Sequence, residues 1–331
     1  MDYGSILDNA LSSALGPDAI VFALAAIGLN VHFGYTGLLN FGQAGFMSVA
    51  AYGLAVSVVT FSLPFWVGIG MGFLAAFVLA VVLGLPTLRL RADYLAIATI
   101  ATAEILRLIF GSVEYADTLG GSNGLNGYAG TFQDLNPYNG PLDLGIFSFS
   151  RNDAWSITVG WVLVALSCVV IWALMRSPWG RVLRSIREDE DAVRSLGKNV
   201  FFYKMQSLIL GGMFGALAGF MLALKQASVV PTDYSTNLTF FAYTALLLGG
   251  AGRVLGPVVG SIIFWFLIAF LGSFFGQATA GVDPLLPNWL MTDIQSSLVR
   301  FIIVGAGLML LMIYRPQGIF GDRREIAIDG R

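Results

Sequence analysis

Nine apolar runs separated by short polar stretches dominate the pattern of this chain. They cover residues 19–33, 38–60, 64–88, 93–113, 154–175, 205–225, 238–252, 255–275 and 295–314. A helix needs ~20 apolar residues to cross the hydrocarbon core of a bilayer. The runs therefore predict an all-α polytopic membrane protein with about nine transmembrane helices, within a range of roughly eight to ten. The second run is rich in glycine, and the seventh is short enough to be re-entrant.

The distribution of Lys and Arg orients these helices. Cytoplasmic loops of membrane proteins carry an excess of both residues. With the N-terminus outside and the C-terminus in the cytoplasm, 14 of the 18 basic residues face the cytoplasm: Arg89, Arg91, seven between 176 and 204, Arg253, Arg315, Arg323, Arg324 and Arg331. Arg151 and Lys225 fall outside. This orientation makes 114–153 an external loop and 176–204 a cytoplasmic loop.

Composition supports a single transmembrane domain over residues 1–331. The chain is 56% hydrophobic and 11% charged, whereas about a quarter of the residues of a soluble domain are charged. Residues 1–18 contain three Asp and no Lys or Arg, so no cleaved signal peptide is predicted. No nucleic-acid partner is expected, and the lipid bilayer is the surrounding medium.

Motifs for enzymatic chemistry are missing from the sequence. One His and one Cys cannot build a zinc site. The segment 249–257 is rich in glycine but lacks the Gly-Lys-Ser/Thr that binds phosphate in a P-loop. It is better explained as a tight cytoplasmic turn between two spans. We therefore expect a transport protein, with no metal and no cofactor bound by this chain.

Two groups of polar residues fall within the apolar runs. Asn40, Gly42 and Gln43 lie in a glycine-rich stretch, Gly37–Gly45, which predicts a broken helix beside a translocation path or, alternatively, close helix packing. Glu104 and Arg107 are spaced i,i+3 near mid-membrane and can form an ion pair. Such a pair suggests a functional site, although a structural pair facing another helix has the same pattern. The lone His32 fits a packed residue better than a ligand.

The cytoplasmic loop 176–204 is the most polar part of the chain. It carries 7 of the 18 basic and 4 of the 20 acidic residues. Arg181, Arg184 and Arg187 are spaced along one face of a short predicted helix, and a second small-residue segment follows to Gly197. This pattern suits a helix that docks into a cleft of another protein, or a solvated basic loop that obeys the positive-inside rule.

Several motifs resemble the branched-chain amino-acid ABC transporter permease family, in its M-type subunit, with urea and amide permeases as close relatives. Asp191, Ala192, Val193 and Gly197 match the spacing of the coupling-loop signature, although Asp replaces Glu and Val replaces the second Ala. The other matching segments are 34–37 with 41–43, 90–94, 120–124, 177–190, 249–257 and 315–320. The resemblance extends over nearly the whole chain.

This resemblance implies an import permease in the cytoplasmic membrane of a prokaryote. A second, homologous permease would complete the path, two cytoplasmic ATPases would hydrolyse ATP, and an extracytoplasmic binding protein would deliver substrate. It implies an ATPase contact within the segment 184–197, at Arg184, Arg187, Glu188, Asp191, Ala192 and Gly197. It places Asn40, Gly42, Gln43, Glu104 and Arg107 close to the path, and Ser122 and Asn123 at an outer gate or at the binding-protein dock.

Three classes of function stay open at this point. The import permease is favoured, because ion-coupled carriers usually need chains of Asp, Glu or His in their spans and this chain has few. An ion-coupled carrier would transport substrate by itself. A membrane scaffold or receptor would show no flux. Within the family, the sequence does not separate branched-chain amino acids from urea or short amides.

Overall fold

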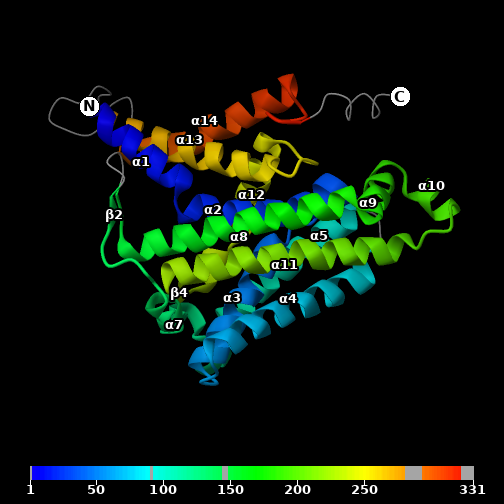
Figure 1. Cartoon of the computed structure of the whole chain (residues 1–331), viewed down its shortest axis with the longest axis horizontal. Helices are drawn as coiled ribbons and strands as arrows, with labels where there is room; N and C mark the ends of the chain where they lie inside the picture. Colours follow the sequence, from blue (N-terminus) through cyan, green and yellow to red (C-terminus); the bar gives the residue numbers. More distant parts are fainter. Residues whose placement is uncertain (1, 90–91, 144–147, 280–292, 322–331) are drawn as a thin grey trace.

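The computed structural model describes residues 2–89, 92–143, 148–279 and 293–321. Leu90, Arg91 and the basic residues Arg323, Arg324 and Arg331 lie outside these ranges. A helix lies over each of the nine apolar runs, and short elements fill the loops (Figure 1). The long helices are α2 (Pro17–Leu29), α3 (Gln43–Val59), α4 (Phe65–Thr87), α5 (Ala92–Phe110), α8 (Arg151–Arg176), α11 (Val200–Gln226), α12 (Thr236–Gly249), α13 (Gly256–Thr279) and α14 (Asp293–Tyr314).

Shorter elements connect most of the long helices, and α1, which is as long as α2, precedes them. Helical ones are α1 (Tyr3–Leu15), the π-helix η1 (Asn30–Tyr35), η2 (Val113–Tyr115), α6 (Ala116–Leu119), η3 (Gly121–Asn123), α7 (Gly130–Asp134), α9 (Pro178–Glu188), α10 (Glu190–Ser195) and η4 (Pro231–Tyr234). Two antiparallel pairs of two-residue strands join β1 (Leu125–Asn126) to β4 (Ser228–Val229) and β2 (Leu142–Asp143) to β3 (Ser148–Phe149).

Among the described residues, length and apolarity identify five helical stretches that can cross a membrane, or six if one bent pair forms a single span. The five are Tyr3–Tyr35, α4, α8, α11 and α13. The bent pair joins Tyr94–Phe110 to Val113–Leu119 at an angle of 59°. The helices α3, α12 and Leu298–Tyr314 are apolar but shorter. The protein is therefore a polytopic, all-helical membrane protein over its described residues.

Helix α2 forms the centre of the bundle. Every residue from 19 to 29 is buried, as expected for a helix that is apolar on all sides. It contacts α8, α11, α12 and α13. Each outer helix buries only one stripe of residues along its length. On α8 this stripe includes Gly160, Val164 and Ile171. The remaining apolar side chains of the outer helices are exposed on the outside of the bundle.

The N-terminal segment differs from its prediction. Residues 1–18 were expected to lie outside the apolar runs, but α1 extends from Tyr3 to Leu15 and packs against α13. The buried residues of α1 are Ile6, Ala10 and Ala14, one side chain on each successive turn. The predicted loops 114–153 and 176–204 also end earlier than expected. Helix α8 already begins at Arg151, and α11 already begins at Val200.

Long helices run from one end of the molecule to the other. Figure 1 shows α9 and α10 at one end of α8 and α11, whereas α7, β2 and β4 lie at the opposite end. The polar loop with the basic excess is therefore separated from the acidic loop by the full length of the bundle. This separation is the arrangement that the charge pattern predicts.

Close contact between α3 and α11 depends on Gly219. A Cβ at this position would lie 2.2 Å from the carbonyl oxygen of Met47, so Gly219→Ala is expected to push the two helices apart. Overpacking costs about 1–3 kcal/mol, more than the gain in helix propensity of about 1 kcal/mol. Thermal unfolding in detergent should show a lower midpoint. The control is Gly276→Ala on α13, where a Cβ meets no atom within 4 Å and the midpoint should not fall.

Candidate functional site

The first feature of the site is a break between α2 and α3. Helix α2 continues without interruption into η1, whose hydrogen bonds span five residues in place of four. The chain is then non-helical from 37 to 42, and α3 begins at Gln43. Gly37 has φ +74°, a conformation that favours glycine. The predicted helix break is therefore confirmed, while its place beside a path stays a prediction.

Polar side chains fill this break. His32, Asn40 and Gln43 are each completely buried. The amide nitrogen of Asn40 lies 3.1 Å from His32 Nδ1 and donates to Gln43 Oε1 at 3.1 Å. His32 Nε2 lies 3.1 Å from the carbonyl oxygen of Leu208. A carbonyl oxygen can only accept, so Nε2 carries the proton and Nδ1 accepts from Asn40.

The same network joins the break to α11. Gln43 Nε2 donates to the carbonyl oxygen of Gly211 at 3.1 Å, and Thr36 Oγ1 lies 2.7 Å from Ser207 Oγ. A Cβ at Gly211 would come within 2.2 Å of His32 Nε2, so the helices meet at backbone distance. Asn40 and Gln43 therefore lie in a closed, hydrogen-bonded core in this conformation. Gly42, beside them, packs against the backbone of Thr99 on α5.

The second feature is the ion pair on α5. Arg107 Nη2 lies 2.5 Å from Glu104 Oε1, and Arg107 Nε lies 3.0 Å from Glu104 Oε2, so the contact is bidentate. The predicted pairing is confirmed. Exposure of the two side chains is 41% for Glu104 and 25% for Arg107. Glu104 is six residues from the end of α5, which places it about 9 Å inside the helix end.

Apolar side chains are exposed along α5 next to this pair. The exposed residues of α5 next to it include Ile97, Ile105 and Leu108. On neighbouring α12, Asn237 and Phe240 are exposed one turn apart. The surface formed by these residues with Glu104 and Arg107 is called the α5–α12 face below. Glu104 and Arg107 give this face an accessible ion pair.

The third feature is the pair of short helices α9 and α10 at the basic end. Pro178 at the first position starts α9, and the Asp189 side chain accepts from the backbone nitrogen of Ala192 at 2.9 Å to start α10. Gly197 ends the segment with φ +78°. The predicted amphipathic helix is present, because α9 buries Leu183 and Ile186 and exposes its charged side chains.

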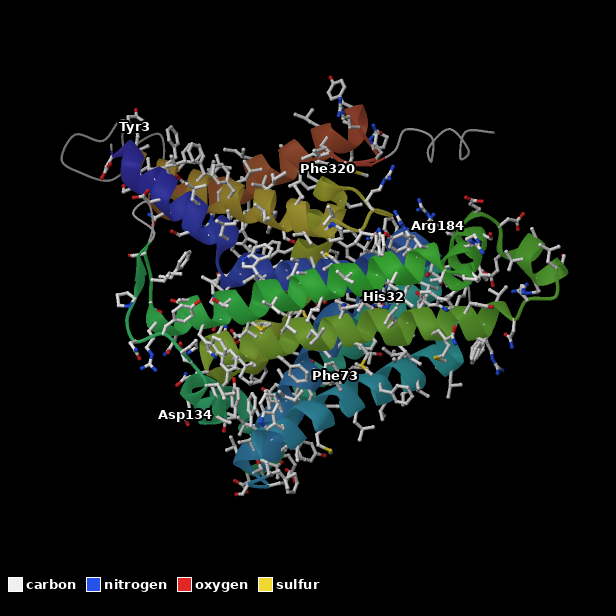
Figure 2. All side chains as sticks on the ribbon, in the orientation of Figure 1. Tyr3, His32, Phe73, Asp134, Arg184 and Phe320 are labelled. Carbon is white, nitrogen blue, oxygen red and sulfur yellow. The ribbon has the colours of Figure 1, made fainter. Side chains whose placement is uncertain are left out.

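The residues predicted to contact an ATPase are all exposed at the surface of α9 and α10: Arg184, Arg187, Glu188, Asp191, Ala192 and Gly197. The two arginines differ from the others because their charged groups also reach other parts of their own chain. Arg187 Nη1 donates to the carbonyl oxygen of Gly34 at 2.6 Å, and Arg184 Cζ lies 5.7 Å from the centre of the Tyr35 ring. Figure 2 shows Arg184 at this end of the bundle, with His32 further inside.

A cavity of about 710 Å³ adjoins α10 and the start of α11. Its charged lining consists of Arg89, Arg194, Lys198, Glu190 and Asp191. Arg194 is paired with both acids, at 2.9 Å each. The exposed surface next to the predicted coupling residues is therefore hollow and mixed in charge.

The end of the bundle opposite α9 and α10 carries the other predicted site residues. Ser122 and Asn123 are exposed in η3, and the loop is fixed by the pairing of Leu125 with Val229. Tyr128 donates to the carbonyl oxygen of Ala223 at 2.7 Å. Nearby in η4, burial raises the pKa of the Asp233 carboxyl above its ordinary value. The described part of the loop around η3 thus has an accessible polar edge.

Sequence reasoning missed several contacts between distant segments. Asn30 holds the turn between α12 and α13, because its Nδ2 donates to the carbonyl oxygen of Arg253 and its Oδ1 accepts from Gly252, both at 2.8 Å. Glu190 pairs with Lys204 across the coupling loop. In the sequence, the only sign of these contacts was that Asn30 is a polar residue near the end of an otherwise apolar run. Within the described residues, no group of three His, Cys, Asp or Glu side chains could hold a metal ion.

Comparison with known proteins agrees with this architecture. Residues 15–312 match the family model described as branched-chain amino acid transport system / permease component. The chain belongs to this family. Its members are the non-catalytic transmembrane subunits of ABC transporters, and the resemblance noted in the sequence is therefore confirmed.

Similar proteins come from bacteria and archaea. The chain is 28% identical to the high-affinity branched-chain amino acid transport system permease protein LivM of Escherichia coli K12, over 91% of this chain and 68% of that protein. It is 24% identical to the probable branched-chain amino acid transport permease protein LivM of Methanocaldococcus jannaschii, over 92% and 91%. It is also 28% identical to an Escherichia coli autoinducer 2 import system permease protein, LsrC, over 40% and 37%.

Proposed function

We propose that this chain is one of two permease subunits of an ATP-driven importer of branched-chain amino acids. Membership of the permease family supports the transporter class, and the names of the two relatives that match over nine-tenths of this chain support the substrate. The chain would cross the cytoplasmic membrane of a prokaryote nine times, with the N-terminus outside and the C-terminus inside. Two ATPases would bind at α9 and α10, and an extracytoplasmic binding protein would bind at the outer loop.

The accessible ion pair on the α5–α12 face carries the proposal for the path. A charge that faces lipid at this depth costs roughly 2.5–3.5 kcal/mol. Glu104 and Arg107 reduce that cost by pairing, but both stay partly accessible. Protein or water, and not lipid, therefore covers this face in the membrane. The second permease subunit is the cover that we propose, with the translocation path between the two subunits.

A broken helix next to this face supports the same assignment. Phe41, in the non-helical segment between η1 and α3, contacts the Phe240 ring on the α5–α12 face with ring centres 5.7 Å apart. The backbone nitrogen of Phe41 donates to Thr99 Oγ1 on α5 at 3.0 Å. The break is thus attached directly to the proposed path, as in transporters whose sites are formed by interrupted helices. Asn40, Gly42 and Gln43 would act by holding this segment in place.

Gentle purification of the chain from its own membranes, followed by mass spectrometry of the proteins that remain bound, tests the proposed assembly. Two kinds of result are distinguishable. Soluble ATPase subunits together with a second hydrophobic permease subunit would support the importer. A chain recovered alone, or only with copies of itself, would contradict it and favour an ion-coupled carrier.

A further inference from the structure

We propose that Arg187 is the positioning residue through which α9 moves the π-helical break η1. Movement of the ATPases would then reach the proposed path through η1 and the buried network behind it, and not only through α8 and α11, the two long helices that flank the coupling loop. This inference rests on the proposed function, because it assigns a role in coupling ATP hydrolysis to transport.

The central observation is a hydrogen bond between segments 153 residues apart. Arg187 Nη1 donates to the carbonyl oxygen of Gly34, within η1, at 2.6 Å. The donor is charged, which makes this kind of hydrogen bond shorter and stronger than a neutral one. In a π-helix the regular four-residue pattern of helix hydrogen bonds is interrupted, and such interruptions are frequent at functional sites. The guanidinium is therefore anchored at the irregular part of the span.

The backbone of α9 lies close to the break. A Cβ at Gly37 would be 3.4 Å from Arg187 Cγ and 3.6 Å from Arg187 Cα. Gly37 also has φ +74°, so the turn after η1 brings its backbone directly against α9. One helical turn earlier, Arg184 Cζ lies 5.7 Å from the centre of the Tyr35 ring. Two arginines of α9 thus contact η1 from the same side.

Behind η1, hydrogen bonds continue into the bundle. Thr36 Oγ1 donates to the carbonyl oxygen of Val31 at 2.9 Å and lies 2.7 Å from Ser207 Oγ. His32, in the same π-helix, links η1 to Asn40 and to α11. A shift of η1 therefore changes contacts that fix both the start of α3 and the middle of α11.

Space for this movement is present beside Arg187. A cavity of about 270 Å³ lies under α9, and its lining includes Gly37, Leu38, Thr87, Leu95, Arg187 and Lys204. This cavity is partly open to solvent, so it leaves room beside α9 at the surface. A tilt of α9 into this space, with the hydrogen bond from Arg187 to Gly34 kept, is the movement that the proposal requires.

The test uses the complete transporter, with its ATPases and binding protein, in lipid vesicles. Substrate uptake and ATP hydrolysis are measured in the same vesicles. Arg187→Met keeps the length of the side chain but removes the donor to Gly34. It should lower uptake per ATP hydrolysed by about fivefold or more, the lower end of typical coupling between sites. Arg187→Lys, which keeps a donor, should restore part of the ratio. The control is Arg181→Met, an exposed residue of the same helix, which should leave the ratio unchanged.

An unchanged ratio in Arg187→Met would overturn the inference, even if less complex assembles, because a purely structural role lowers the amount of complex and not its coupling. Hydrogen–deuterium exchange on the wild-type complex gives an independent test if this variant does not assemble. A non-hydrolysable ATP analogue should change exchange in residues 30–37 together with residues 178–188. A change confined to 178–188 would overturn the inference. Wild-type complex without any ATP-dependent uptake would instead contradict the proposed function itself.

Discussion

Glu104→Gln is expected to reduce transport about tenfold, and more than Glu104→Gln combined with Arg107→Gln. The single change leaves the Arg107 guanidinium without its carboxylate on the α5–α12 face. Removing one partner of a fully buried ion pair lowers the stability of a protein by about 3–5 kcal/mol. Because the side chains are 41% and 25% exposed, water or partner groups reduce that cost, and we expect about 1–2 kcal/mol.

Uptake by the complete transporter, normalised to the amount of assembled complex, measures this effect. The double variant removes both charges and leaves no unpaired group, so it should recover part of the activity. The control is Glu114→Gln, which removes an exposed carboxylate from the outer loop and should have little effect. A double variant that is no better than the single one would show that the two residues do not act as a pair.

Asp191→Arg and Gly197→Ile are expected to uncouple ATP hydrolysis from transport while the membrane helices still insert. Asp191 is exposed in the first turn of α10 and pairs with Arg194 at 2.9 Å, so Arg reverses the charge presented to an ATPase. Gly197 has φ +78°, which a β-branched residue adopts only with strain. A Cβ there meets no atom within 4 Å, so the effect would come from the backbone turn and not from a clash.

The quantity to measure for both variants is substrate uptake per ATP hydrolysed. We expect this ratio to fall about tenfold, which lies within the usual range of coupling between two sites. Matched controls separate the causes. Asp191→Asn removes the charge without reversing it, and Gly197→Asn introduces a residue that tolerates the left-handed conformation. Both controls should stay near the wild-type ratio. Normal coupling in Asp191→Arg and Gly197→Ile would rule out this surface as the ATPase contact.

The positions of the long helices could be predicted because apolar periodicity is a local signal. Each of the nine runs contains a helix, and the run that is apolar on every side became the buried helix α2. Helix α1 was missed because it buries only one small or medium side chain per turn. Three Asp residues interrupt the apolar pattern of residues 1–18, and the packing of α1 on α13 is not visible in the local sequence.

Site contacts were predictable only where the partners are close in sequence. Glu104 and Arg107 are one helical turn apart, and their pairing followed from helix geometry. The contacts of Arg187 with Gly34 and of His32 with Leu208 join residues 153 and 176 positions apart. They depend on how four helices pack together, which no local pattern records. The sequence therefore indicated polar residues near the break without showing that they form one closed network.

The most direct test of the account is uptake of labelled leucine into vesicles that contain this chain, its permease partner, the ATPases and the binding protein, with no ion gradient. The account predicts uptake that requires ATP, requires every subunit and is not competed by urea. Leucine uptake by this chain alone, driven by a proton or sodium gradient in the absence of ATP, would contradict it.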